Sequence, residues 1–167
     1  MSYVGEEKRK MKIRIAFYKY TKKPLNAFIA LWTWLLNIGT PSYSHVEIGF
    51  EGTNEWSYYS STLRGDSKGT RWIRESAVIK HPYRWDVYEI EVDYVVHMMS
   101  RANSIVGNDY DLWGLTGFIL PFRLFNSKKK WYCSEAVYYV LTGLWKRRIS
   151  PRRLFSYISN KFKLKKI

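Results

Sequence analysis

The chain is poor in residues that form disulfides or bind metals. Cys133 is the only cysteine among 167 residues, so an intrachain disulfide and a zinc site built from several cysteines are both excluded. Such sparing use of cysteine is typical of a reducing compartment. Only three histidines are present, His45, His81 and His97, and no group of His, Cys and carboxylate residues has the spacing of metal ligands. The sequence therefore predicts neither a metal ion nor another cofactor.

Acidic residues are half as numerous as basic ones. The chain has 14 Asp and Glu against 28 Lys and Arg, which gives a formal net charge of +14. Much of the surplus lies near the chain ends, in residues 8–14 and 146–166. Such a surplus attracts nucleic acid, anionic lipid or an acidic polymer such as cell-wall glycan, although a solvated basic face is the commoner reason for any single cluster. We expect an anionic polymer or a membrane surface among the partners, and the charge says little about chemistry.

No apolar run is long enough to span a membrane as a helix. Residues 25–38 are apolar almost all round, but they number only about 14, whereas a membrane-spanning helix needs ~20. We expect a buried or interface-packed helix there. The charged N-terminus, residues 1–12, has no apolar segment of the kind that marks a secretory signal. Length and composition predict one domain over residues 1–167, with basic tails at about 1–11 and 158–167.

Hydrophobic periodicity predicts strands in the middle of the chain and helices around them. Alternation of polar and apolar residues predicts strands at residues 11–20, 45–50, 55–62 and 85–92, with a further element at 70–74. Helices are expected at residues 93–106, from Leu112 onward, from Cys133 to near Gly143, and from Pro151 with Ser150 as its N-cap. This order indicates an α+β fold with an antiparallel sheet rather than alternating βαβ units.

Cys133 lies at or just before the start of a predicted helix, after the three lysines 128–130. Unpaired N–H groups and the helix dipole favour an anion at that position, which activates a thiol. A buried structural cysteine is the alternative interpretation, because free cysteines are among the most buried residues. His45 opens a predicted strand, where its ring can project at a sheet edge. A Cys and a His together are more specific than either alone, since a thiolate nucleophile needs a base or an imidazolium partner.

Two short motifs carry a resemblance to a known family. The stretch Tyr43–Phe50, followed by a Ser-rich strand, and the later stretch Trp131–Glu135 together resemble the circularly permuted NlpC/P60 (papain-like) cysteine hydrolases. The closer likeness is to the YiiX-like group and its small bacteriophage-encoded relatives, in which the His precedes the Cys. Further echoes are residues 69–71, 109–111 with Gly114, and 150–151, so the likeness spans roughly residues 12–157.

The resemblance implies a fold and a set of catalytic residues. The fold would be the permuted papain-like one, an antiparallel central sheet with flanking helices, with Cys133 as nucleophile and His45 as general base. The family's third residue orients the imidazole from the next strand, and YiiX-like enzymes are expected to use Glu there. Ser60 falls nearest that place in this chain. Glu47 is the alternative, because residue i+2 on a strand shares the face of His45 at a distance of ~7 Å.

The function implied by the resemblance is a cysteine hydrolase of the amidase or peptidase type. It would act on an amide, ester or thioester in a peptide, glycopeptide or acyl substrate, such as a peptidoglycan peptide or a host conjugate. A phage-encoded protein without a signal peptide is expected in the host cytoplasm or in the virion. Two alternatives stay open. Ser in place of the family Glu, with the net charge of +14, is consistent with a catalytically weak or inactive papain-like binding module. A nucleic-acid-binding role for residues 146–166 is less favoured, because no recognised motif supports it.

Overall fold

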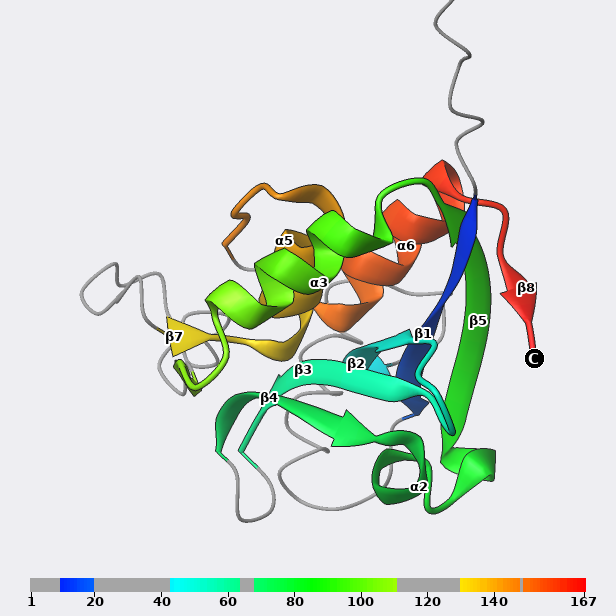
Figure 1. The fold of residues 1–167 in the computed structure, drawn as a ribbon, viewed down its shortest axis with the longest axis horizontal. Coiled ribbons are helices and arrows are strands. Elements are labelled where there is room, and N and C mark those ends of the chain that lie inside the picture. The colour runs from blue at the N-terminus through cyan, green and yellow to red at the C-terminus, as the bar shows by residue number, and fades with distance from the viewer. Residues whose placement is uncertain (1–9, 20–42, 64–67, 111–129, 148) are drawn as a thin grey trace, which may run out of the picture.

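The computed structural model describes residues 10–19, 43–63, 68–110, 130–147 and 149–167. The helices expected at residues 25–38 and from Leu112 lie outside these residues. Six strands form one antiparallel sheet in the order β4-β3-β2-β1-β5-β8 (Figure 1). The strands are β1 (Met11–Lys19), β2 (Tyr43–Phe50), β3 (Ser57–Thr62), β4 (Gly69–Arg74), β5 (Trp85–Val92) and β8 (Lys165–Lys166). The large antiparallel sheet confirms the predicted α+β class.

Alternation along β1 determines which face of the sheet is buried under the helices. Ile13, Ile15 and Phe17 are fully buried and belong to the hydrophobic core, opposite Phe50, Ile48 and Val46 of β2. The intervening residues of β1 point to the other face, where Tyr18 pairs with His45 and Ala16 pairs with Glu47. The polar and apolar alternation of the sequence therefore places His45 and Glu47 on a face different from that of the main apolar core.

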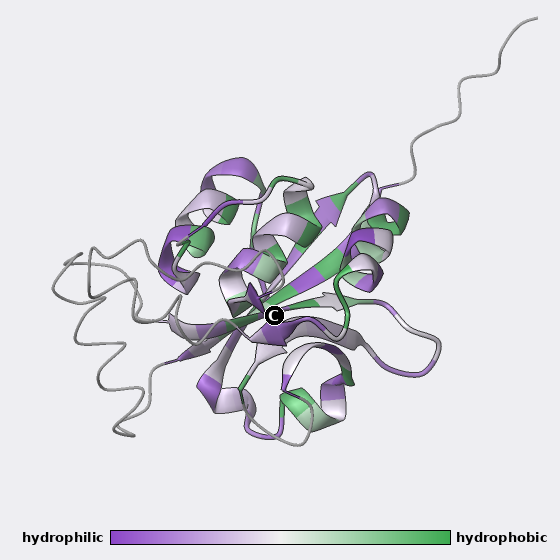
Figure 2. Cartoon of the chain, turned by 90° about the vertical axis from the view of Figure 1, so that its left-hand side faces the viewer, coloured by the Kyte–Doolittle hydropathy of each residue, from purple (hydrophilic) through white to green (hydrophobic). Residues whose placement is uncertain are grey.

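Three helices complete the core. They are α3 (Val95–Ser104), α5 (Cys133–Thr142) and α6 (Pro151–Lys161). Helix α5 packs against β2, β3 and α3, and α6 packs against β2 and α5 (Figure 1). Helices α3 and α6 have exposed residues on one side, whereas no residue of α5 is exposed. Figure 2 shows hydrophilic and hydrophobic residues side by side on the helical ribbons. None of the helices among the described residues is sufficiently long and apolar to cross a membrane.

The ends of α5 and α6 follow the sequence signals. Gly143 adopts the left-handed conformation with φ of 74°, and its N–H donates to the Tyr139 carbonyl at 2.7 Å, which ends α5 as predicted. Ser150 caps α6 by accepting a hydrogen bond from the Arg153 N–H at 3.2 Å, with Pro151 in the first turn. Both predicted helix boundaries are confirmed.

The strands β2 and β3 separate at the end that faces the start of α5. Their register covers only Ile48–Phe50 of β2. Beyond it, the Ser60 hydroxyl donates to the Val46 carbonyl at 2.7 Å, and the Ser61 hydroxyl donates to the Trp131 carbonyl at 2.7 Å. The first bond bridges the separated part of β2 and β3, and the second ties β3 to the residues just before α5. The first turn of α5 consequently lies beside the opening of the sheet.

Four short elements were not predicted from the sequence. They are α2 (Glu75–Val78), the 3-10 turn η1 (Pro82–Arg84), and the two-stranded parallel pair β6 (Asp109–Tyr110) and β7 (Lys130–Trp131). The C-terminal residues assigned to a basic tail also have regular structure. Residues 158–161 complete α6, and β8 pairs with β5 at the edge of the sheet. The Lys166 ammonium lies 2.7 Å from the Asp86 carboxylate, an ion pair that polarity along the chain alone does not reveal.

Gly69 is expected to be the least replaceable glycine at the site end of the sheet. Its φ is +94°, and a Cβ built on it would lie 2.2 Å from the Asn108 carbonyl oxygen. Gly107 has a similar φ of +81° but open space around it. We therefore expect Gly107→Ala to lower the free energy of unfolding by about 1 kcal/mol and Gly69→Ala to lower it by ~2 kcal/mol or more. Urea unfolding measures both, and equal losses would contradict the backbone clash.

Candidate active site

Cys133 is the first residue of α5 and is fully buried. The residues around it fix the start of the helix. The Glu135 carboxylate accepts a hydrogen bond from the Tyr132 backbone N–H at 3.4 Å, one half of a capping box. The Ser134 hydroxyl donates to the carbonyl of Ile149 and ties the first turn to the segment before α6. The thiol is thus held at the helix N-terminus, where unpaired N–H groups and the helix dipole stabilise negative charge.

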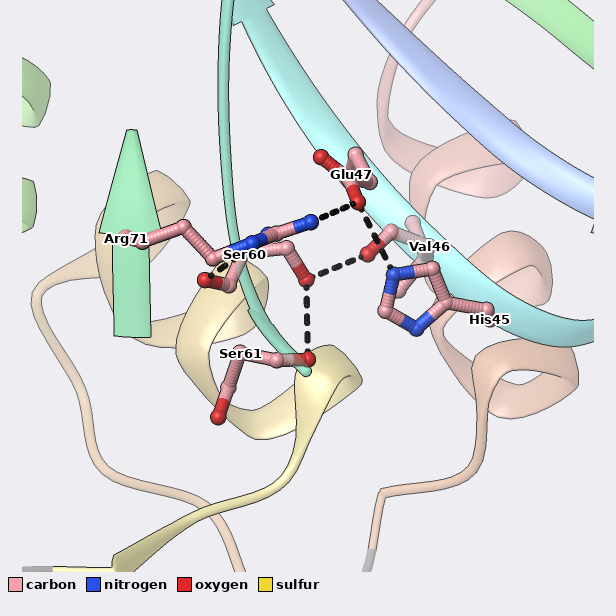
Figure 3. A network of polar contacts seen from close by, with 6 residues as sticks. All are labelled: His45, Val46, Glu47, Ser60, Ser61 and Arg71. Atoms are coloured by element: carbon pink, nitrogen blue, oxygen red, sulfur yellow. Dashed lines mark hydrogen bonds and ion pairs between the residues drawn. The ribbon is translucent and has the colours of Figure 1, made fainter. Parts of the chain in front are cut away.

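The fold brings His45 to Cys133 although the two residues are far apart in the sequence. Interaction with Cys133, through its charge and a side-chain hydrogen bond, is the largest cause that raises the pKa of the imidazole, so the two side chains lie next to each other. Its Nε2 lies 3.0 Å from Oε1 of Glu47 (Figure 3). The two other histidines lie elsewhere, His81 in the loop before η1 and His97 in α3. Cys133 and His45 have the contact that thiol nucleophiles and their bases require.

The surroundings of His45 favour its protonated form. Burial lowers the pKa of the imidazole, but the charge of the Cys133 thiolate and its hydrogen bond to the ring act in the opposite direction, and Glu47 adds to them. Together they raise the pKa of His45 from 6.5 to about 9. A raised pKa means that the imidazolium stabilises the fold below about pH 6.5, and this stability is lost as the pH rises through about 9.

Of the two candidates for the third position, Glu47 is the one in contact with the imidazole. Glu47 comes from the same strand as His45, is almost fully buried, and bonds to the ring as described above. Ser60 is also buried, but its hydroxyl donates to the backbone carbonyl of Val46 and, weakly at 3.5 Å, to that of Ser61 (Figure 3). Glu47 is therefore placed to orient the His45 ring, whereas Ser60 binds backbone carbonyls beside it.

Arg71, on β4, completes the chain of contacts. Its Nη2 donates to Oε1 of Glu47 at 3.0 Å, and its Nη1 donates to the Ser60 carbonyl at 3.4 Å. Burial raises the pKa of Glu47, but the hydrogen bond from His45 and the charge of Arg71 outweigh burial and hold it below its usual value of 4.5. The role of Arg71 was not predicted from the sequence. A usable signal existed, because an acid inside the apolar strand Val46–Phe50 needs a cationic partner.

Tyr132 is a second site residue that was not predicted. Burial, and then the charge and hydrogen bond of Cys133, raise the pKa of the phenol far above its usual value. The hydroxyl therefore stays protonated and can donate a hydrogen bond to negative charge at Cys133. Tyr132 lies close to Cys133 because it is the residue immediately before it in the motif Trp131–Glu135.

The site reaches the surface at the imidazole. The side chain of His45 is 22% exposed, whereas Cys133 is fully buried. On the same face of the sheet, Trp85 lies with its ring centroid 6.3 Å from that of His45 and 5.0 Å from that of Tyr18. A row of three rings across β2, β1 and β5 therefore borders the exposed edge of the site.

In the part of the chain that the structure describes, no three His, Cys, Asp or Glu side chains are grouped so as to hold a metal ion. The described site residues offer a thiol, an imidazole, a carboxylate and a guanidinium.

No model of a known protein family matches the chain, and no curated protein was found to match it.

Replacing Cys133 with Ser is expected to lower the pKa of His45 well below 9, toward its ordinary value of 6.5. The reason is that the thiolate makes the largest of the contributions that raise this pKa, while burial, which lowers it, remains. Glu47→Gln is expected to lower it by less. Titration of the His45 ring by NMR measures both shifts. An unchanged His45 titration in Cys133→Ser would contradict a thiolate–imidazolium pair.

Proposed function

We propose that the protein is a cysteine hydrolase that transfers acyl groups through Cys133. The observation that carries this proposal is the contact chain from Cys133 to His45, Glu47 and Arg71, in which a thiol at a helix N-terminus meets an imidazole that is itself held by a carboxylate. Nucleophile, base and orienting group in this order are the arrangement used by thiol hydrolases.

In the proposed reaction, the Cys133 thiolate attacks the carbonyl carbon of an amide, ester or thioester and forms a tetrahedral intermediate. Backbone N–H groups in the first turn of α5, including that of Cys133, would stabilise its oxyanion. The His45 imidazolium donates its proton to the leaving amine, alcohol or thiol as the C–N, C–O or C–S bond breaks. Neutral His45 then accepts a proton from water, which attacks the acyl-enzyme and regenerates the thiolate and the imidazolium.

The proposal includes the permuted papain-like fold. A permuted papain-like fold is supported by the order of the elements, with His45 on an early strand and Cys133 at the head of a later helix packed on the same sheet. The motifs around both residues support it independently. Glu47 supplies the carboxylate that YiiX-like enzymes are expected to use, although it comes from the strand of His45 and not from the next one.

The substrate class follows from the chemistry and not from a bound molecule. A thiolate with a proton donor beside it acts on peptide, glycopeptide or other acyl substrates, and we place a peptidoglycan peptide or a host conjugate first. The expected places of action are the host cytoplasm and the virion of a phage. The alternative of an inactive binding module is favoured by one observation, the complete burial of Cys133.

Acylation of Cys133 by an activated acyl donor tests the proposal. Incubation with a p-nitrophenyl ester, followed by intact-mass and peptide mass spectrometry, is expected to show a transient acyl adduct on Cys133 in the wild type and none in Cys133→Ser. Release of p-nitrophenol gives the rate. A folded wild type without an adduct would contradict the hydrolase and leave the binding module as the better interpretation.

A further inference from the structure

The loop between α5 and α6 exposes two large apolar side chains next to two basic ones. Leu144 is 64% exposed and Trp145 is 39% exposed, although most apolar residues of the described chain are buried or partly buried. Lys146 and Arg147 follow directly in the sequence, and the Arg147 guanidinium lies 4.3 Å above the Trp145 ring. An exposed Leu–Trp pair costs free energy in water, and burial against another apolar phase would recover it.

The surface around this loop is positively charged. No acidic residue follows Glu135 in the chain, whereas nine Lys and Arg do. The ammonium of Lys146 lies 5.6 Å from the centre of the Tyr138 ring, and Tyr138 contacts Tyr157 of α6 with ring centroids 5.2 Å apart. Lys161 lies 5.6 Å from the centre of the Tyr157 ring. Basic groups therefore continue from the loop across α5 to the end of α6, and the acidic residue of α5, Glu135, is buried.

We propose that residues 143–147 form a docking loop for anionic lipid bilayers. Trp is favoured at the level of the lipid headgroups, where its ring is buried and its N–H stays hydrated. Leu144 would enter the acyl region, and Lys146, Arg147 and Lys161 would contact negative headgroups, each basic residue adding about a factor of five in affinity near the surface. The combination of an apolar tip with a basic surround is the recognised pattern of interfacial membrane binding.

Two features favour a lipid surface over nucleic acid. Leu144 is more exposed than Trp145, and an aliphatic side chain gains little from phosphates or bases but much from a hydrocarbon phase. Few ring faces are left for stacking with bases, because Arg147 lies over one face of the Trp145 ring and Tyr138 is buried. The basic residues would attract both lipid headgroups and nucleic acid, so the preference for lipid comes from the exposed apolar residues Leu144 and Trp145.

The docking loop also lies close to the strand that leads to the candidate nucleophile. The ring centroid of Trp145 is 6.5 Å from that of Trp131 on β7, two residues before Cys133. This contact places the loop near the site, but the docking inference does not rest on the proposed hydrolase, because it depends only on the exposure and charge of the loop.

Vesicle binding tests the inference. The full chain is mixed with sucrose-loaded vesicles of phosphatidylcholine, alone or with phosphatidylserine, and the bound fraction is measured by sedimentation. We expect binding only to vesicles that contain phosphatidylserine. Leu144→Ser/Trp145→Ser and, separately, Lys146→Gln/Arg147→Gln should each weaken it on the order of tenfold. Val96→Ser removes an apolar residue that is 75% exposed on α3 and is the matched control, expected to bind as the wild type does.

Three results would contradict the inference that residues 143–147 dock on anionic lipid bilayers. They are equal binding to both kinds of vesicle, wild-type binding by the Leu144/Trp145 variant, and binding to a single-stranded oligonucleotide without binding to vesicles. The Lys146/Arg147 variant keeps the apolar tip intact, so it still tests the inference if the Leu144/Trp145 variant fails to fold. Circular dichroism establishes folding for each protein before its binding is compared.

Discussion

His45→Ala is expected to slow acylation of Cys133 near pH 7 by ~100-fold or more, the range over which general acid–base groups act. The imidazole lies next to Cys133, and its pKa is raised to about 9, so near pH 7 it carries the proton that the leaving group needs. Without the ring, the thiol would have to lose its proton to water, and no group would protonate the leaving atom. The initial rate of p-nitrophenol release, matched to the adduct on Cys133, measures the effect.

The other two histidines provide the control for this variant. His81 and His97 lie outside the site, so His81→Ala and His97→Ala should acylate at the wild-type rate. A similar loss in all three variants would indicate a general effect on folding and not the loss of a base. Wild-type acylation in folded His45→Ala would contradict the assigned role of the ring.

Arg71→Met is expected to lower the free energy of unfolding by ~3 kcal/mol, because breaking a buried ion pair from one side is strongly destabilising and leaves His45 as the remaining partner of the Glu47 carboxylate. The side chains of Arg71 and Glu47 are 16% and 2% exposed, and their atoms are 3.0 Å apart. The charge of Arg71 helps to keep the Glu47 carboxylate ionised. Without it, the pKa of Glu47 rises, and the hydrogen bond that holds the His45 ring weakens.

Two further variants distinguish the effect of losing the ion pair from the effect of losing an arginine side chain on β4. The double variant Glu47→Gln/Arg71→Met removes both charges, so it should be more stable than Arg71→Met alone. Arg74→Met is the matched control on the same strand, because its side chain is 82% exposed and lies 3.8 Å from Glu55, and it should change stability little. Urea unfolding measures the free energy of unfolding of the wild type and of the three variants. Equal losses for Arg71→Met and Arg74→Met would show that burial of the Glu47 pair carries no special cost.

The parts of the structure that were predictable are those set by local patterns. Alternation along β1 and β2, the glycine at the end of α5, and the Ser-Pro start of α6 each depend on residues close together in the chain. Cys133 and His45 could be named as candidates because their residue types are rare in this sequence. Whether they meet depends on the packing of α5 against β2, which no local pattern determines.

The residues that were missed act through contacts between distant strands. Arg71 is 24 positions from Glu47, and its role follows only from the order of β4, β3 and β2 in the sheet. Ser60 was the candidate by its position along the chain, but separation of β2 from β3 directs its hydroxyl to the Val46 carbonyl. Likewise, β8 pairs with β5 and Lys166 lies next to Asp86 at the sheet edge, whereas a run of lysines alone predicts a solvated tail.

The central claim, a thiolate–imidazolium pair between Cys133 and His45, is tested most directly by the pH dependence of alkylation with iodoacetamide, followed by mass spectrometry of the folded protein. At about pH 6.5 an ordinary free thiol is only about 1% ionised. The account predicts that wild-type Cys133 reacts at that pH faster than an ordinary free cysteine and that His45→Ala removes this excess. If Cys133 is inert, or reacts alike in both proteins at every pH, the pair does not exist and the hydrolase assignment fails with it.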